Sequence, residues 1–189
     1  FTDQTTIGFR FYPGILPLMF KTDPVKFTNN SVLLKDVIAQ PEYKTLYLKL
    51  LSSLNTRKKI STLNSFILKL FNPLQPGQDE LFSVIKKIVS ADGNVKLEEI
   101  YNGLFISERQ FQRKFLKFTG LSPKEFSRIV RFHNITRKLV KNNFRHFDTL
   151  VEAGYYDQSH YYREFKEFLG MLPGKYETRQ KNISHKKLL

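Results

Sequence analysis

The stretch Ile106-Ser-Glu-Arg-Gln-Phe-Gln-Arg-Lys-Phe-Leu-Lys-Phe118 predicts a short helix with one apolar face. Phe111, Phe115 and Phe118 recur at i, i+4 and i+7, which is the spacing of a stripe along one side of an α-helix. Ser107 stands where an N-cap is expected, and a Gln follows it three residues later, as in a capping box. We therefore expect a helix that begins after Ser107 and buries three Phe side chains in a core.

The opposite face of this predicted helix is polar and carries Arg109, Gln112 and Arg113. Arg and Gln are the side chains that pair bidentately with guanine and adenine edges in the major groove of DNA. For this helix alone, a surface helix with ordinary solvated charges is an equally good interpretation.

The chain repeats this pattern fifty residues later. Both copies contain a cap residue, an apolar stripe, an outward Arg and a Gly that ends the helix. The matched pairs are Ser107 with Asp157, Phe111 with Tyr161, Arg113 with Arg163, Phe115 with Phe165, Phe118 with Phe168, Gly120 with Gly170 and Pro123 with Pro173. Because only two copies occur, they indicate a paired module rather than a solenoid.

A short helical pattern precedes each copy. Leu97 to Leu104 precedes the first, and Phe147 to Ala153 precedes the second, with Gly154 at the turn. A short helix, a tight turn and a capped second helix are typical of a helix-turn-helix. The sequence therefore predicts two such motifs in tandem.

A longer helix is predicted between the two motifs. Ser122, Pro123 and Glu125 form a dense helix-start signal, and the pattern runs to about Val140. Its expected apolar positions are Phe126, Ile129, Val130, Phe132 and Leu139. At 1.5 Å per residue this helix would span roughly 27 Å.

The first part of the chain is less regular. Residues 5–12 alternate and carry β-forming residues, so they predict a strand, and a short helix or turn follows at Ile15 to Phe20. Two helical patterns come next, separated by Asn55 to Ser61. They are marked by Leu46, Leu50, Leu51 and Leu54, and by Leu63, Ile67, Leu70 and Phe71. Residues 73–79 hold two Pro and a Gly, which predicts a linker and a domain boundary.

Composition and charge indicate an anionic partner. The 189 residues carry a formal net charge of +14, and residues 107–145 hold eleven basic side chains against two acidic ones, a net +9. A purely solubilising surface would intersperse both signs more evenly. Such a balance is typical of binding to nucleic acid or to an acidic membrane surface. The absence of Cys removes disulfides, thiolate metal sites and Cys nucleophiles, and fits a reducing cytoplasm.

Four runs of residues resemble the DNA-binding domain of the AraC/XylS family of bacterial transcription regulators. They are Ser107-Glu-Arg-Gln-Phe-Gln-Arg-Lys-Phe115, Gly120-Leu-Ser-Pro123, Gly154-Tyr-Tyr-Asp-Gln-Ser-His-Tyr-Tyr-Arg-Glu-Phe-Lys-Glu-Phe-Leu-Gly170 and Pro173-Gly-Lys-Tyr176. The resemblance spans about residues 80–177. The family has Phe more often than Tyr at the positions of Tyr155 and Tyr161.

The resemblance implies a mainly α fold, with two homeodomain-like helix-turn-helix subdomains joined by a long linking helix. The run Gly8-Phe-Arg-Phe-Tyr-Pro-Gly14 resembles a pattern at the end of the N-terminal sensing region of some members. We therefore expect a small α/β remnant of a sensing domain at 1–72, a linker at 73–79, the double helix-turn-helix domain at 80–177 and a basic tail at 178–189. Most of the sensing fold would lie upstream of Phe1.

The resemblance also implies the residues that contact DNA. They are Arg109, Gln112 and Arg113 in the first motif, and Gln158, Ser159, His160 and Arg163 in the second, where Arg163 could grip a phosphate instead of a base. The implied function is sequence-specific regulation of transcription, controlled by the N-terminal region. Double-stranded DNA is the implied partner, and RNA polymerase, a small-molecule effector and a second copy of the chain are further candidates.

Other classes of function have weaker support. Asp157, Ser159 and His160 adjoin in sequence, but such neighbours on a helix do not face one another as a catalytic triad must. No phosphate loop, dinucleotide fingerprint or Gly-x-Ser-x-Gly motif is present either, so we expect no enzyme and no cofactor. The four His are scattered without ligand spacing, so we expect no metal site. A role at a membrane surface or as a scaffold could also use the basic face. No apolar run is long enough for a membrane span and no signal peptide is recognisable, so a cytoplasmic, nucleoid-associated protein is expected.

Overall fold

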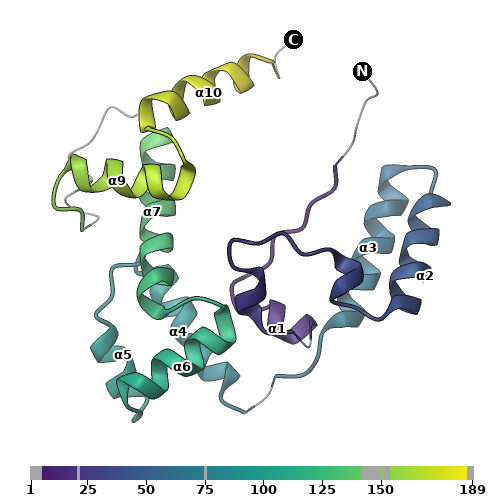
Figure 1. Ribbon diagram of the computed structural model, residues 1–189, viewed down its shortest axis with the longest axis horizontal. Coiled ribbons are helices and arrows are strands. Elements are labelled where there is room, and N and C mark those ends of the chain that lie inside the picture. The colour runs from purple at the N-terminus through teal and green to yellow at the C-terminus, as the bar shows by residue number, and fades with distance from the viewer. Residues whose placement is uncertain (1–5, 21, 75, 142–149, 151–153, 187–189) are drawn as a thin grey trace. The chain divides into compact units, whose positions relative to one another are not determined.

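A computed structural model describes residues 6–20, 22–74, 76–141, 150 and 154–186 (Figure 1). Over these residues the regular structure is helical, which confirms a mainly α protein. The chain divides into two compact units, Phe1–Ile85 with Tyr101–Pro123, and Lys86–Ile100 with Lys124–Leu189.

The first unit begins with short helical turns followed by a helical hairpin. The turns are α1 (Leu16–Met19), η1 (Pro24–Phe27) and η2 (Leu34–Asp36), and the hairpin is α2 (Gln40–Leu51) with α3 (Thr56–Leu70). The prediction that Asn55 to Ser61 separates two helices is wrong. The Asn55 side chain accepts a hydrogen bond from the backbone N–H of Lys58 at 2.8 Å, so it caps α3 and the helix begins at the next residue.

The strand predicted over residues 5–12 is also wrong for the part that the structure describes. Residues 6–12 form no regular element, and the described part of the chain contains no strand that could pair with them. β-forming residues favour a strand only when a neighbouring strand completes the hydrogen-bond ladder. The expected α/β remnant is therefore helical and irregular over residues 6–72, apart from Lys21, which is not described.

The first unit also holds the capped helix with the predicted Phe stripe. It is α6 (Glu108–Thr119), preceded by α4 (Gln78–Ser90) and α5 (Leu97–Gly103), which both run across the boundary between the units. The predicted apolar stripe is confirmed, because Phe111, Phe115 and Phe118 are all buried. Phe118 packs edge-on against Phe82 of α4, with 5.0 Å between the ring centroids.

The N-terminal segment packs against the C-terminal end of α6. The Thr28 hydroxyl donates a hydrogen bond of 2.8 Å to the carbonyl of Gly120, the residue that caps α6. Gly120 has φ +81°, and a Cβ there would lie 2.7 Å from the carbonyl oxygen of Pro24. A Gly is therefore needed at this position for two reasons, its left-handed conformation and the close approach of η1.

The second unit is built on α7 (Pro123–Lys141), α9 (Gln158–Leu169) and α10 (Pro173–Lys186). The long helix predicted from Pro123 to about Val140 is confirmed as α7. Its core side chains pack against α9 and the residues that flank it. This core consists of Phe132, Ile135, Leu139, Leu150, Tyr155, Tyr161 and Phe165.

One predicted core position of α7 is wrong. Ile129 is 38% exposed, whereas Ile135, which was not predicted, is buried. The buried face of α7 is centred on Phe132, Ile135 and Leu139, at the i, i+3, i+7 spacing, and Ile129 lies at the margin of that face.

The polar tail expected at 178–189 is helical where it is described, because α10 continues to Lys186. No Pro or Gly between residues 175 and 186 interrupts that helix. Among the described helices, none combines the length and the apolar character that crossing a membrane would require.

Candidate nucleic-acid interface

The first candidate surface is the outward face of α6. Ser107 accepts a hydrogen bond from the backbone N–H of Gln110, and the Gln110 side chain accepts one from the Ser107 N–H, so the predicted capping box is present. Arg109, Gln112 and Arg113 are all exposed, opposite the buried Phe stripe. The local sequence therefore places these three polar side chains together on one accessible surface.

The second candidate surface is on α9, where Asp157 is the N-cap and accepts a hydrogen bond of 2.7 Å from the backbone N–H of His160. Gln158, Ser159 and Arg163 are exposed, as are the matching residues of α6. His160 differs, because its ring is partly buried and meets the ring of Tyr155 edge-on at 5.1 Å. The four predicted residues therefore do not form one equally accessible set.

The residue with a left-handed backbone lies at a different distance from the N-cap in the two motifs. In the first motif Phe105 has φ +54° and lies two residues before the N-cap Ser107. In the second motif Gly154 has φ +80° and lies three residues before the N-cap Asp157. The helix predicted at Phe147 to Ala153 lies outside the described residues.

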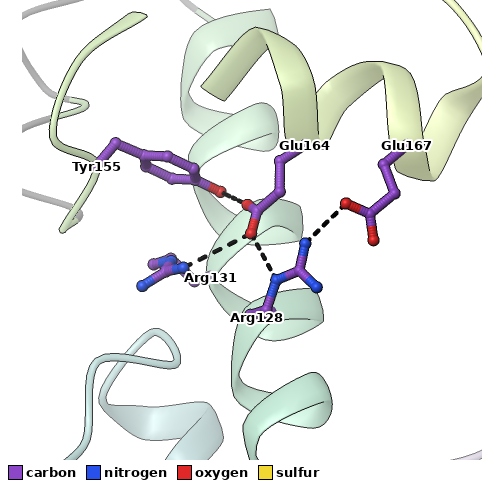
Figure 2. Close-up of polar contacts among 5 residues, drawn as sticks. All are labelled: Arg128, Arg131, Tyr155, Glu164 and Glu167. Carbon is purple, nitrogen blue, oxygen red and sulfur yellow. Dashed lines mark hydrogen bonds and ion pairs between the residues drawn. The ribbon is translucent and has the colours of Figure 1, made fainter. Parts of the chain in front are cut away.

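A polar cluster joins α9 to α7 (Figure 2). Glu164 points inward from α9 and is only 3% exposed. The Arg128 Nε donates a hydrogen bond of 2.8 Å to one carboxylate oxygen of Glu164, and the Tyr155 hydroxyl donates one of 2.5 Å to the other. Arg131 lies 3.7 Å from Glu164, and a second nitrogen of Arg128 reaches Glu167 at 2.9 Å.

The electrostatics of this cluster favour the charged arginine and the neutral tyrosine. The hydrogen bond to Glu164 raises the pKa of Arg128, and the bond to Glu167 adds to the effect. Burial raises the pKa of Tyr155, and its hydrogen bond to Glu164 raises it further. Arg131 also lies over the Tyr155 ring, 5.0 Å from its centroid. The buried carboxylate is thus compensated by two cations and a hydroxyl donor, which together hold α9 against α7.

Comparison with known proteins agrees with this arrangement of helices. Residues 101–179 match the family model described as a helix-turn-helix domain. These residues are an AraC-type helix-turn-helix domain. A relative, the uncharacterized HTH-type transcriptional regulator YbfP of Bacillus subtilis (strain 168), is 31% identical over 90 residues. The aligned part is 48% of this chain and 30% of that regulator, so the chain matches less than a third of its length. No solved structure matches the chain significantly.

The contact of Glu164 with Arg128 and Arg131 was not predicted from the sequence. Glu164 was not among the residues singled out from the sequence, and it is buried. A signal was available, because Tyr161, Glu164, Phe165 and Phe168 follow the i, i+3, i+4, i+7 spacing of one helix face. An acidic residue within an apolar stripe predicts a buried ion pair, although its partners on α7 could not be named from spacing.

Some of the basic residues at 107–145 are paired with acidic residues within the protein. Arg128 and Arg131 face Glu164, and Lys138 binds Asp92 at 3.0 Å, so three of the eleven cations at 107–145 are paired. Arg145 lies outside the described residues. Among the described residues, the other exposed cations of this stretch, for which the structure shows no ion pair, are Arg109, Arg113, Lys114, Lys117, Lys124, Arg137 and Lys141. Four of these seven belong to α6, so α6 presents a cluster of accessible positive charge on its outward face.

Proposed function

We propose that this chain is a sequence-specific DNA-binding regulator of transcription, which reads two adjacent major-groove segments with α6 and α9. The observation that carries the proposal is the outward face of α6. Arg109, Gln112 and Arg113 are exposed to solvent on this face, and a capping box and a buried Phe stripe hold the helix in place. The match of residues 101–179 to a helix-turn-helix domain supports the proposal, as does the similarity to an HTH-type transcriptional regulator of Bacillus subtilis.

In this proposal α9 is the second reading helix and contacts DNA through Gln158, Ser159, His160 and Arg163. The helix α7 would act as the spacer between the two motifs. Its 19 residues correspond to about 28 Å. Successive major-groove faces on one side of B-DNA are about 34 Å apart, so a spacer of this length suits two reading helices within one chain.

We also propose the wider organisation of the chain. Residues 1–72 would be the end of a sensing region, 73–79 a linker, 80–177 the DNA-binding domain and 178–189 a basic extension. The hydrogen bond from Thr28 to the cap of α6 supports control of DNA binding by the N-terminal region, because it joins the two parts directly. An effector bound to that region, a second copy of the chain and RNA polymerase are the further partners proposed, and the site of action would be the bacterial nucleoid.

The proposal is tested by selecting bound duplexes from a random DNA pool with the full 189-residue chain. We expect one sequence to be enriched, and binding to it to persist in the presence of competitor DNA. The logarithm of the binding constant should fall with the logarithm of the salt concentration, with a slope of about −0.9 per phosphate contacted. Binding to anionic lipid vesicles that equals binding to DNA would favour the membrane-surface alternative. No enriched sequence, or an affinity unchanged between low and physiological salt, would contradict the proposal.

The two reading helices are expected to differ in their roles. Arg113→Ala should cost about 1–3 kcal/mol of binding free energy and relax base preference at one or two positions, because Arg109 and Gln112 share its face. Arg163→Ala should weaken binding to all sequences more evenly and make the salt slope shallower by about one contact. Both variants are measured against the selected duplex and its single-base changes at two salt concentrations.

Arg57→Ala is the matched control, since Arg57 is an exposed Arg on α3, outside both motifs. It should change neither the base preference nor the slope. If Arg163→Ala alters base preference as sharply as Arg113→Ala, the two helices read DNA equally and the expected asymmetry is wrong.

A further inference from the structure

Phe105, in the turn before α6, combines two unfavourable features. Its backbone has φ +54°, in the left-handed region that bulky side chains rarely adopt. Its side chain is 94% exposed, so packing against the protein does not compensate for the strain. A bulky residue kept in a strained conformation with its ring in water indicates that the ring is used elsewhere.

Phe105 differs in residue type from the other described residues in a left-handed conformation. Apart from Phe105, the described non-Gly residues with positive φ are Asn29 and Asp92, and Asn and Asp tolerate this conformation. The turn before α9 has Gly154 at its left-handed position. A Gly would therefore meet the backbone requirement at residue 105, and the need for Phe lies in its side chain.

The position of the ring indicates the partner. Phe105 lies two residues before the N-cap of α6 and four residues before Arg109, the first of the proposed reading residues. Recognition helices of this motif contact base edges with their N-terminal residues, so this end of α6 would lie nearest the DNA. Tyr156 lies directly before the N-cap of α9 and is 91% exposed. Each turn thus presents an unburied aromatic side chain at the start of its reading helix.

We propose that Phe105 and Tyr156 are DNA-contacting residues, whose rings pack against deoxyribose and thymine methyl groups at the edge of the major groove. Apolar side chains, Phe among them, make such contacts with thymine methyl groups. The uncharged ring would add affinity that is insensitive to salt, beside the Arg contacts that are salt-dependent. This inference rests on the proposed function and adds two residues outside the predicted set.

Phe105→Gly separates the two effects of the residue. Relief of the left-handed strain should raise the unfolding midpoint of the chain by roughly 2–4 °C. Loss of the ring contact should weaken binding to the selected duplex by about tenfold, with the salt slope unchanged. Phe105→Ala keeps the strain and removes the ring, so it should lose similar affinity without a rise in the unfolding midpoint.

Leu54→Ala is the matched control, because Leu54 is also an apolar side chain, 99% exposed, in the turn between α2 and α3. It should leave DNA affinity unchanged. Tyr156→Ala should weaken binding in the same way as Phe105→Ala, and Tyr156→Phe should retain most of the affinity, because the ring makes the contact.

Several outcomes would overturn the inference. In one, the wild-type chain binds the selected duplex and Phe105→Gly raises the unfolding midpoint but leaves affinity unchanged. In another, Phe105→Gly keeps its affinity for DNA and loses only promoter-dependent transcription with RNA polymerase. That result would assign the ring to a protein partner. A lower unfolding midpoint for Phe105→Gly would show that the ring stabilises the fold. Failure of the wild-type chain to select any duplex would instead contradict the proposed function.

Discussion

Glu164→Ala is expected to lower the free energy of unfolding of the second unit by about 3 kcal/mol or more. Removing one partner of a buried ion pair typically costs about 3–5 kcal/mol, because the other charge is left uncompensated. The side chains of Arg128 and Arg131 are 31% and 20% exposed. Because water can solvate the two cations after the carboxylate is removed, the lower end of that range of energies applies. The buried Tyr155 hydroxyl would also lose its acceptor, which adds about 1–3 kcal/mol.

Glu167→Ala provides the control for this prediction. Glu167 is the other acidic partner of Arg128, at a similar distance of 2.9 Å, but it is 57% exposed. Exposed ion pairs contribute about 1 kcal/mol or less, so the control should change stability little. Chemical denaturation of both variants, followed by far-UV circular dichroism, measures the difference. Equal losses for the two variants would show that the buried carboxylate does not hold α9 against α7.

Ile129→Pro is expected to break α7 and abolish sequence-specific binding. Position 129 is the seventh residue of the helix, so Pro removes an interior hydrogen bond and its ring clashes with the preceding turn, at about 3 kcal/mol or more. Arg128 and Arg131 lie on either side of the break and both face Glu164, so a kink would also disturb the contact between α7 and α9. The proposed spacer between the reading helices would then no longer be rigid.

Ile129→Ala isolates the backbone effect of the Pro. Because the Ile129 side chain is 38% exposed, its truncation should cost well under 2 kcal/mol and leave binding to the selected duplex nearly normal. Affinity and base preference are measured for both variants. Normal specific binding by Ile129→Pro would contradict the role of α7 as a single rigid spacer.

The helices of the candidate interface were accessible to sequence reasoning because their signals are local. The caps at Ser107 and Asp157, the terminating Gly120 and Gly170, and the start at Pro123 act within one or two turns of the chain. Hydrogen bonds of this range depend on residue type and spacing alone. The sequence therefore predicted α6, α7 and α9, the buried Phe stripe of α6 and the exposure of Arg109, Gln112 and Arg113.

The features that the sequence did not predict depend on neighbours far away along the chain. The strand expected at 5–12 lacks a pairing strand among the described residues, and the margin of the α7 core at Ile129 is set by where α9 lies. The strain at Phe105 is visible only as a backbone angle. Propensity and periodicity carry no information on which surfaces meet.

By itself, the sequence determined the two capped helices, the long helix between them and the set of polar side chains that they expose. Only the tertiary structure decided which charges are available to a partner. Glu164 meets Arg128 across 36 residues and Lys138 meets Asp92 across 46, so these cations are paired within the protein. The physical reason is that helix formation depends on hydrogen bonds between residues within one turn, whereas an ion pair depends on how separate helices pack.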